Sequence, residues 1–265
     1  MHNMPQALTK IRHGYNFREL GGYQTLDGRM TKYHKLLRTG NLAFLKGNEL
    51  KYLRKYGVKE IIDLRSIKET IDLPDKKLYE AKYVRNPILS KEFLESDRDI
   101  HDMDKQSKNN PLIGYQHMIW AYEDMILSQH GRDAYHRFFE ILLDNTQDND
   151  AIIFHCFFGK DRTGMAAILA LSALNVPLKT IKRDYLSTNN FIEPFVQKRM
   201  LKQLKIGRDN NFMQASFDVS SVKEDYFNHA MNTINQNFGN MQGFLKNGLK
   251  LTDENLNDLK AIYTK

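Results

Sequence analysis

The segment that decides the fold is AIIFHCFFGKDRTGMAAILAL, residues 151–171. It opens with a short apolar run, AIIFH, which is typical of a buried strand. The run TGMAAILALSAL, from Thr163 to Leu174, is typical of a buried helix. Seven residues, from Cys156 to Arg162, lie between the two. This order predicts a thiol at the carboxyl end of a strand and beneath a helix N-terminus, where α/β proteins bind anions.

The spacing Cys156-x5-Arg162 suits phosphate chemistry. Backbone N–H groups of a tight loop can surround the oxygens of a tetrahedral phosphate, and Gly159 allows the loop to curl. Arg162 can bridge two phosphate oxygens with its planar fork, while Cys156 lies in line for attack on phosphorus. A free thiol is mostly protonated at neutral pH, so the whole loop and the helix N-terminus must stabilise the thiolate.

The leaving alcohol or phenol needs a proton. Asp161, inside the loop, is the first candidate for this acid; the alternative is a surface carboxylate that pairs with Lys160 or Arg162. Asp63, at the end of the apolar run VKEIIDL, is the second candidate, and the acidic segment 97–104 is the third. Lys160 supplies a second cation for a substrate with more than one phosphate, unless it is simply an exposed lysine.

The bulk composition predicts one α/β domain. The chain has 265 residues, of which 41% are hydrophobic and 27% charged, as in ordinary globular proteins. We expect a single domain over residues 1–265, with a lid or an insertion at about 206–240. The polar stretches 91–110 and 206–221 are predicted to be surface loops.

The cysteine count and the termini bear on compartment. One cysteine excludes an intramolecular disulfide, and a lone buried thiol is usually only a small hydrophobic residue, so the neighbours of Cys156 carry the functional argument. No apolar run of about 18 residues predicts a transmembrane helix. The first ten residues lack the apolar core of a signal peptide. We expect a cytoplasmic protein, or a secreted one whose export signal is missing from this chain.

The formal charge of +7 favours anionic partners without choosing among phosphates, acidic lipids and nucleic acid. One basic cluster stands out, formed by Lys198, Arg199, Lys202, Lys205 and Arg208. We interpret it as a solvated helix face. Weak contact with an anionic membrane surface is the alternative. We expect no nucleic-acid partner.

The segment HCFFGKDRTG, residues 155–164, resembles the H-C-x-x-G-x-x-R-[S/T] signature of protein tyrosine phosphatases. Its G-K-D-R-T-G version resembles the atypical bacterial PtpB/LipA-like family of tyrosine and phosphoinositide phosphatases. Three further segments are similar to the same family: NFRELGGY at 16–23, DLRSIKE at 63–69 and DYLS at 184–187. Glu19 stands where the family usually has aspartate, which leaves its structural role open.

The resemblance implies a cysteine-based tyrosine-phosphatase-like fold with a central, mostly parallel sheet flanked by helices. It implies that Cys156 is the nucleophile, that Arg162 holds the phosphate and that Asp161 is the acid. The implied substrate-binding residues are Phe157, Phe158, Gly159, Lys160, Thr163 and Gly164. Thr163 is expected to hydrogen-bond the thiolate, and Lys160 resembles the lysine that broadens family members toward phosphoinositides.

Supporting roles are expected for three residues near the loop: His155, Asp63 and Arg65. We expect His155 to hydrogen-bond backbone around the loop rather than to act as a base. The implied activity is hydrolysis of phosphate monoesters, on phosphotyrosine proteins, on phosphoinositides or on both, through a phosphocysteine intermediate. No metal and no cofactor are implied.

Two other classes of function remain open from the residues. A rhodanese-like sulfurtransferase also curls a loop around a cysteine, although Arg162 and Thr163 favour phosphate. A module that binds phosphate without turnover is the other alternative, and the intact pair of Cys156 and Arg162 argues against it.

Overall fold

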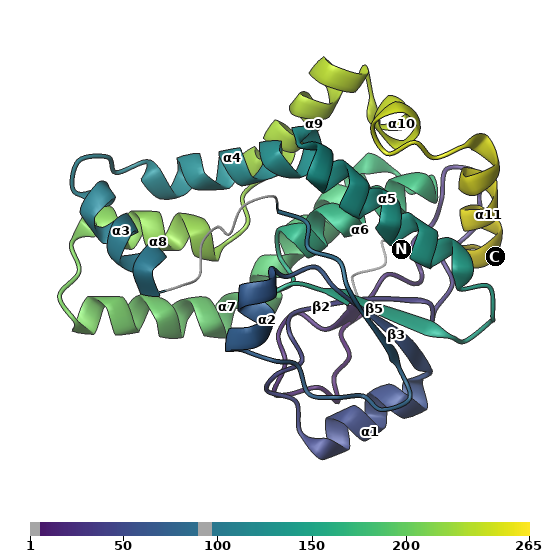
Figure 1. Ribbon diagram of the computed structural model, residues 1–265, viewed down its shortest axis with the longest axis horizontal. Coiled ribbons are helices and arrows are strands. Elements are labelled where there is room, and N and C mark those ends of the chain that lie inside the picture. Colours follow the sequence, from purple (N-terminus) through teal and green to yellow (C-terminus); the bar gives the residue numbers. More distant parts are fainter. Residues whose placement is uncertain (1–5, 90–96) are drawn as a thin grey trace.

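A computed structural model describes residues 6–89 and 97–265 (Figure 1). Its centre is a five-stranded sheet in the order β1-β2-β5-β3-β4. The strands are β1 Arg18–Glu19, β2 Leu36–Thr39, β3 Val58–Asp63, β4 Lys82–Arg85 and β5 Ala151–His155. All neighbouring pairs are parallel except β1 and β2, which are antiparallel. The predicted α/β fold with a mostly parallel central sheet is confirmed.

Helices cover both faces of the sheet unequally (Figure 1). One face is covered by α4 Ile113–Leu127, α5 Gln129–Asp144, α6 Arg162–Ala173, α9 Glu224–Phe238 and α11 Asp253–Tyr263; the opposite face carries α1 Gly47–Tyr56. Strand β5 shows why both faces are buried: Ile152 and Phe154 enter the larger core, while Ile153 enters the smaller one. A strand that is buried on both faces reads as a continuous apolar run.

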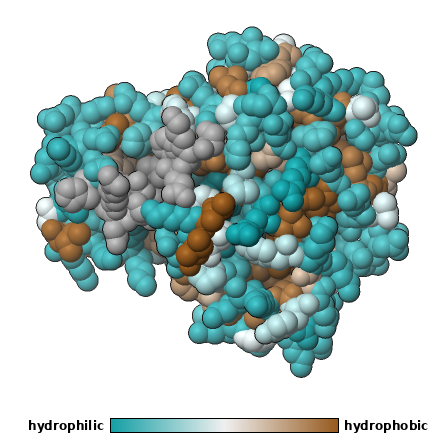
Figure 2. Space-filling model, viewed as in Figure 1, coloured by the Kyte–Doolittle hydropathy of each residue, from teal (hydrophilic) through white to brown (hydrophobic). Residues whose placement is uncertain are grey.

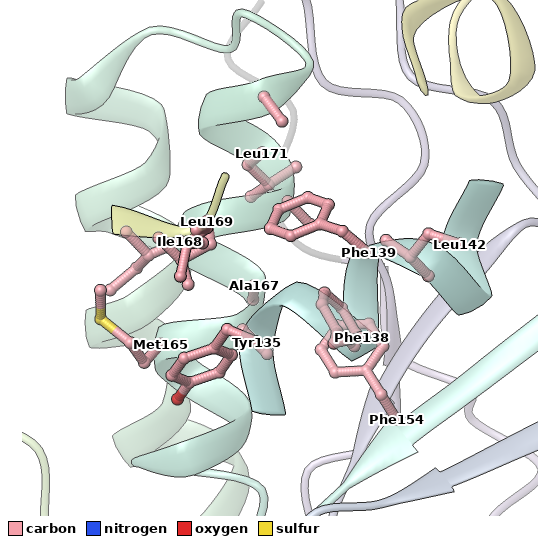
Figure 3. Close-up of a cluster of buried hydrophobic side chains, with 14 of the residues drawn as sticks. Tyr135, Phe138, Phe139, Leu142, Phe154, Met165, Ala167, Ile168, Leu169 and Leu171 are labelled. Atoms are coloured by element: carbon pink, nitrogen blue, oxygen red, sulfur yellow. The ribbon is translucent and has the colours of Figure 1, made fainter. Parts of the chain in front are cut away.

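The larger core fixes the start of α6 (Figure 3). Phe154 of β5 packs edge-to-face on Phe138 of α5, with ring centroids 5.2 Å apart. Every residue of α6 from Arg162 to Ala173 is buried, because this helix lies between the sheet and its neighbours. The hydroxyl of Tyr135 donates a hydrogen bond to the carbonyl oxygen of Arg162 at 3.2 Å. The first turn of α6 is therefore tied to α5.

The prediction of surface loops at 91–110 and 206–221 is wrong for the described parts of those stretches. Helix α3 spans Asp97–Ser107 and helix α8 spans Asn210–Ser220, whereas residues 90–96 lie outside the described part of the chain. The physical reason is a small separate core in which Met103, Phe212 and Ala215 pack together. This core contains few apolar residues, so the composition of the two stretches did not indicate helices.

Helix α8 packs on α3, on α4 and on α7 Leu178–Lys205, and these helices form a lobe at the left of Figure 1. The stretch 206–240 contains α8 in this lobe and α9, whose Tyr226 and Phe227 are buried in the main core. Movement of this stretch as a lid stays a prediction. The remaining helical segments are α2 Ile67–Asp72, α10 Met241–Gly243 and η1 Phe244–Gly248. Within the described ranges, no helix combines the length and apolar character that crossing a membrane requires.

Candidate active site

The seven residues from Cys156 to Arg162, which we call the phosphate loop, join the carboxyl end of β5 to the N-terminus of α6. Gly159 has a φ of +68°, and a Cβ atom there would lie 2.2 Å from the carbonyl oxygen of Thr39. Only glycine satisfies both conditions. The loop therefore curls tightly against the end of β2, as the sequence predicts.

Cys156 and Thr163 lie at the base of this loop. Cys156 forms no disulfide and is only 2% exposed. The hydroxyl of Thr163 is buried and makes no hydrogen bond within the described residues. The expected bond from Thr163 to the sulfur is thus not formed in this geometry. Gly164 follows directly, and a Cβ there would meet the ring of Tyr185 at 3.4 Å.

Arg162 is held by Glu69, a residue that lies in a sequence motif but had no predicted role. Its two terminal nitrogens donate to the two carboxylate oxygens of Glu69, at 2.6 and 2.7 Å. Burial opposes ionisation of Glu69, but Arg162 outweighs it and lowers the pKa of Glu69. Glu69 also accepts from the backbone N–H of Ser66 at 2.8 Å, which caps α2. A bidentate pair fixes the plane of the guanidinium.

Lys160 and Asp161 form a pair at the mouth of the loop. Their side chains approach to 2.5 Å between Nζ and Oδ2, and both are largely buried, so the alternative of an exposed Lys160 is wrong. The hydroxyl of Tyr122 donates to the other oxygen of Asp161 at 3.2 Å and lies 2.7 Å from the hydroxyl of Tyr185. Burial, then Tyr185 and Asp161, raise the pKa of Tyr122, so it remains a proton donor.

A buried network clamps the loop from the side of β1 and β2. The carbonyl oxygen of Gly159 accepts from Asn16 at 2.6 Å and from Arg38 at 2.9 Å. Arg38 also pairs with Asp184 at 2.5 Å, and Arg18 pairs with the same carboxylate at 3.0 Å. Burial raises the pKa of Asp184, but the two arginines outweigh it and lower that pKa to about 2.

This network explains two motifs whose roles the sequence did not reveal. Asn16 and Arg18 belong to NFRELGGY and Asp184 belongs to DYLS, while Arg38 comes from β2. Glu19, from the first of these motifs, accepts from the backbone N–H groups of His34 at 2.7 Å and of Gly21 at 3.2 Å. The charged residues of these motifs are buried. A charged residue in a motif can therefore indicate a buried ion pair as well as a functional site.

Phe157 and Phe158 do different things. The carbonyl oxygen of Phe157 accepts from the backbone and side-chain N–H groups of Asn41, both at 2.9 Å. Phe158 is buried against Phe195 of α7, with ring centroids 4.2 Å apart, and against Tyr15 at 5.8 Å. Phe158 therefore anchors the loop by packing, and its ring is not presented to a substrate.

His155, Asp63 and Arg65 meet behind the loop, in a buried charged cluster with Asp75. His155 lies 3.1 Å through Nδ1 from the carbonyl oxygen of Cys156 and 3.0 Å through Nε2 from Asp75. Burial alone would lower the pKa of His155, but Asp63 and Asp75 raise it to about 9. An imidazolium donates from both nitrogens. His155 thus contacts backbone, as the sequence predicts.

Arg65 completes this cluster and bears on two expectations. Its NH2 nitrogen lies 2.7 Å from Asp63 and 2.9 Å from Asp75. Asp63 also accepts from the hydroxyl of Tyr83. This geometry makes Asp63 a fully bonded carboxylate and a poor candidate for the acid. The ligand atoms of Asp63, Asp75 and His155 are close enough for a metal, but Arg65 and the imidazolium of His155 already balance the two carboxylates.

A parallel strand, a tight loop with cysteine and arginine at its two ends, and a buried helix define the class of tyrosine-phosphatase-like proteins. The chain belongs to the tyrosine phosphatase family, whose sequence pattern matches residues 9–265. It is therefore an enzyme, a hydrolase acting on phosphate monoesters, and the resemblance in the sequence is confirmed.

Three relatives are similar to this chain. A protein of Cupriavidus necator, provisionally named a tyrosine-protein phosphatase, is 26% identical over 238 residues, or 89% of this chain and 82% of that protein. The triple specificity protein phosphatase PtpB of Mycobacterium tuberculosis is 23% identical over 268 residues, or 91% of this chain and 93% of PtpB. A tyrosine-protein phosphatase of Nostoc commune is 28% identical over 160 residues, or 59% of this chain and 49% of that protein.

Proposed function

We propose that this enzyme hydrolyses phosphate monoesters through a phosphocysteine intermediate on Cys156. The observation that carries the proposal is the geometry of the loop ends: Cys156 follows the carboxyl end of β5, and Glu69 holds the fork of Arg162, the first residue of α6. The thiolate attacks phosphorus, the bond from phosphorus to the leaving oxygen breaks, and Asp161 donates a proton to that oxygen.

The second half of the cycle returns the enzyme to its starting state. The carboxylate of Asp161 takes a proton from a water molecule, whose oxygen attacks phosphorus as the sulfur–phosphorus bond breaks. Inorganic phosphate and the thiolate of Cys156 are the products. The hydroxyl of Thr163, which has no other partner among the described residues, stabilises that leaving thiolate.

Lys160 links substrate binding to acid catalysis in this proposal. Its ammonium lies beside Asp161, and an entering phosphate dianion competes for the same cation. Arg162 contributes in parallel: its planar guanidinium, oriented by the pair with Glu69, holds the phosphate oxygens.

We propose phosphotyrosine proteins and phosphoinositides as substrates. Support comes from the cation at Lys160 and from the similarity to PtpB, a protein named for triple specificity. Parallel assays of phosphotyrosyl, phosphoseryl and phosphothreonyl peptides and of mono- to trisphosphorylated inositol lipids test this. Hydrolysis of phosphotyrosyl peptides alone would remove the lipid part of the proposal.

A weak contact with an anionic membrane belongs to the same proposal, in a cytoplasmic or an exported enzyme. Lys198, Lys202 and Lys205 are exposed on α7 and pair with no carboxylate in the described part of the chain, and Leu201 is exposed among them. Arg208, from the predicted basic cluster, pairs instead with Asp104. Sedimentation with phosphatidylserine vesicles tests the contact, and equal sedimentation with neutral vesicles would exclude it.

Cys156→Ser tests the mechanism directly. We expect turnover of an aryl phosphate to fall below detection, because the serine hydroxyl is a far weaker nucleophile than a thiolate at neutral pH. The melting temperature should change little, because serine and cysteine have similar volumes. Trapping of a phosphorylated thiol in the unsubstituted enzyme by acid quench is the companion measurement. Turnover retained in the serine variant would refute the phosphocysteine.

A further inference from the structure

A cavity that no residue of the phosphate loop lines lies on the face of the sheet that carries α1. It has a volume of about 500 Å³, within the range of sites for small molecules. Ile61 of β3 and Ala81 and Tyr83 at β4 line its sheet side. The rim is formed by Ile71 of α2 and by the connection from α2 to β4.

The fold explains why the cavity is open. Helix α1 packs Leu53 onto the smaller core near the middle of the sheet. Among the described residues, the outer strand β4 is covered on this face by the connection 73–81, which has no regular structure. Apolar side chains consequently stay exposed at the rim: Ile71 is 70% exposed and Tyr79 is 84% exposed. Figure 2 shows hydrophobic surface over α2, beside strongly hydrophilic side chains.

The charge of the cavity is positive. Lys76, Lys77 and Arg85 line it, and none of them pairs with a carboxylate in residues 6–89 or 97–265. Asp75 is the acidic group of the lining, but its carboxylate lies 2.9 Å from Arg65 and 3.0 Å from the imidazolium of His155. Arg65 and His155 balance the charge of Asp75, so Lys76, Lys77 and Arg85 determine the electrostatic potential in the cavity.

The rear wall is formed in advance. Tyr83 is fixed by its hydrogen bond to Asp63, and the second oxygen of Asp75 accepts from the backbone N–H of Leu42 at 2.7 Å. A wall that is already ordered costs a ligand little conformational entropy. We propose that this cavity is a binding site for a small amphipathic anion, a molecule with a flat apolar body and one carboxylate, sulfonate or phosphate group.

The test is a fluorescence titration of the full chain with 8-anilinonaphthalene-1-sulfonate, an aromatic sulfonate. Orthovanadate is present at saturation to occupy the phosphate loop. We expect saturable binding of about one molecule per chain that survives orthovanadate. In Lys76→Ser/Lys77→Ser the dissociation constant should rise about tenfold or more, because charge-assisted contacts to the sulfonate are lost.

The matched control removes the same charge from α1. Lys51 and Lys55 are exposed there and line no part of the cavity, so Lys51→Ser/Lys55→Ser should leave the dissociation constant unchanged. Tyr79→Ser, at an exposed position, should raise the dissociation constant of the probe by removing a contact with its aromatic body, without changing the charge of the cavity. Four results would each overturn the proposal. The first two are an absence of saturable binding and displacement of the probe by orthovanadate. The other two are an unchanged dissociation constant in the Lys76/Lys77 variant and an equal increase of the dissociation constant in the Lys51/Lys55 control.

Discussion

Asp161 is the residue whose chemical role depends most on its neighbours. Lys160 and Tyr122 hold its two oxygens, one by charge and one by a hydrogen bond. We expect Asp161→Asn to slow phenyl phosphate about 10²-fold or more and p-nitrophenyl phosphate far less, because only the poorer leaving group needs a proton. Steady-state rates on both esters measure this.

Tyr122→Phe is the companion of that variant. It removes the hydrogen bond to Asp161 but keeps the carboxyl group, so its effect on phenyl phosphate should be smaller than that of Asp161→Asn. If Asp161→Asn slowed both esters equally, Asp161 would be a structural partner of Lys160 and not the acid.

Glu69 acts through Arg162 and is a positioning residue. The bidentate pair holds a long side chain that otherwise has about 2 kcal/mol of rotamer entropy. We expect Glu69→Gln to lower kcat/KM about 10- to 100-fold and to raise the dissociation constant of orthovanadate. Gln can still cap α2, so the melting temperature should fall little.

The control for that variant is Glu224→Gln, because Glu224 also pairs with a cation, Lys182, but on an exposed surface. It should leave kcat/KM and orthovanadate binding unchanged. Tighter orthovanadate binding in Glu69→Gln would mean that Glu69 competes with phosphate for Arg162 rather than orienting it.

At the scale of elements, the phosphate loop is held by the ends of β1 and β2 and by α7. Asp184 of α7 balances Arg18 and Arg38 in a fully buried site. Removal of one partner of such a set leaves an uncompensated charge, which costs about 3–5 kcal/mol. We expect Asp184→Asn to lower the free energy of unfolding by about this amount, measured by urea denaturation.

Activity distinguishes a loop effect from general instability. At a temperature where Asp184→Asn is still folded, kcat should fall because Arg38 no longer holds the carbonyl of Gly159 in place. Arg29→Gln, which breaks an exposed pair with Asp27, should change neither quantity. A stable and fully active Asp184→Asn variant would show that the clamp is dispensable.

The same elements show how far sequence reasoning reaches. The strand at AIIFH and the buried helix were predictable from their apolar runs, and the curled loop was predictable from Gly159, because these features depend on local sequence. The pairing of Glu69 with Arg162 was not, since those residues are 93 positions apart and only tertiary packing joins them. Asn16 and Arg38 were missed for the same reason. Helices α3 and α8 were missed because both stretches were read from their polar composition, while the few apolar side chains that pack them form a small separate core.

At the scale of the whole molecule, the buried cluster behind the loop links β3, β5 and the connection to β4. His155 carries the positive charge that, with Arg65, balances Asp63 and Asp75. Its pKa is raised to about 9 in the folded protein against about 6.5 in an unfolded chain. The folded state therefore holds this proton more tightly than the unfolded state does.

That difference predicts how stability depends on pH. The contribution of His155 is fully present below about pH 6.5 and is lost as pH rises through about 9, a decrease of about 3 kcal/mol in the free energy of unfolding. Urea denaturation at a series of pH values between 6 and 9.5 measures it. His155→Asn should be less stable at pH 6.5, because two carboxylates then face Arg65 alone, and its stability should change less over the same interval. Parallel curves for the two proteins would mean that His155 is neutral in the folded state and that Asp75 is balanced by Arg65 only.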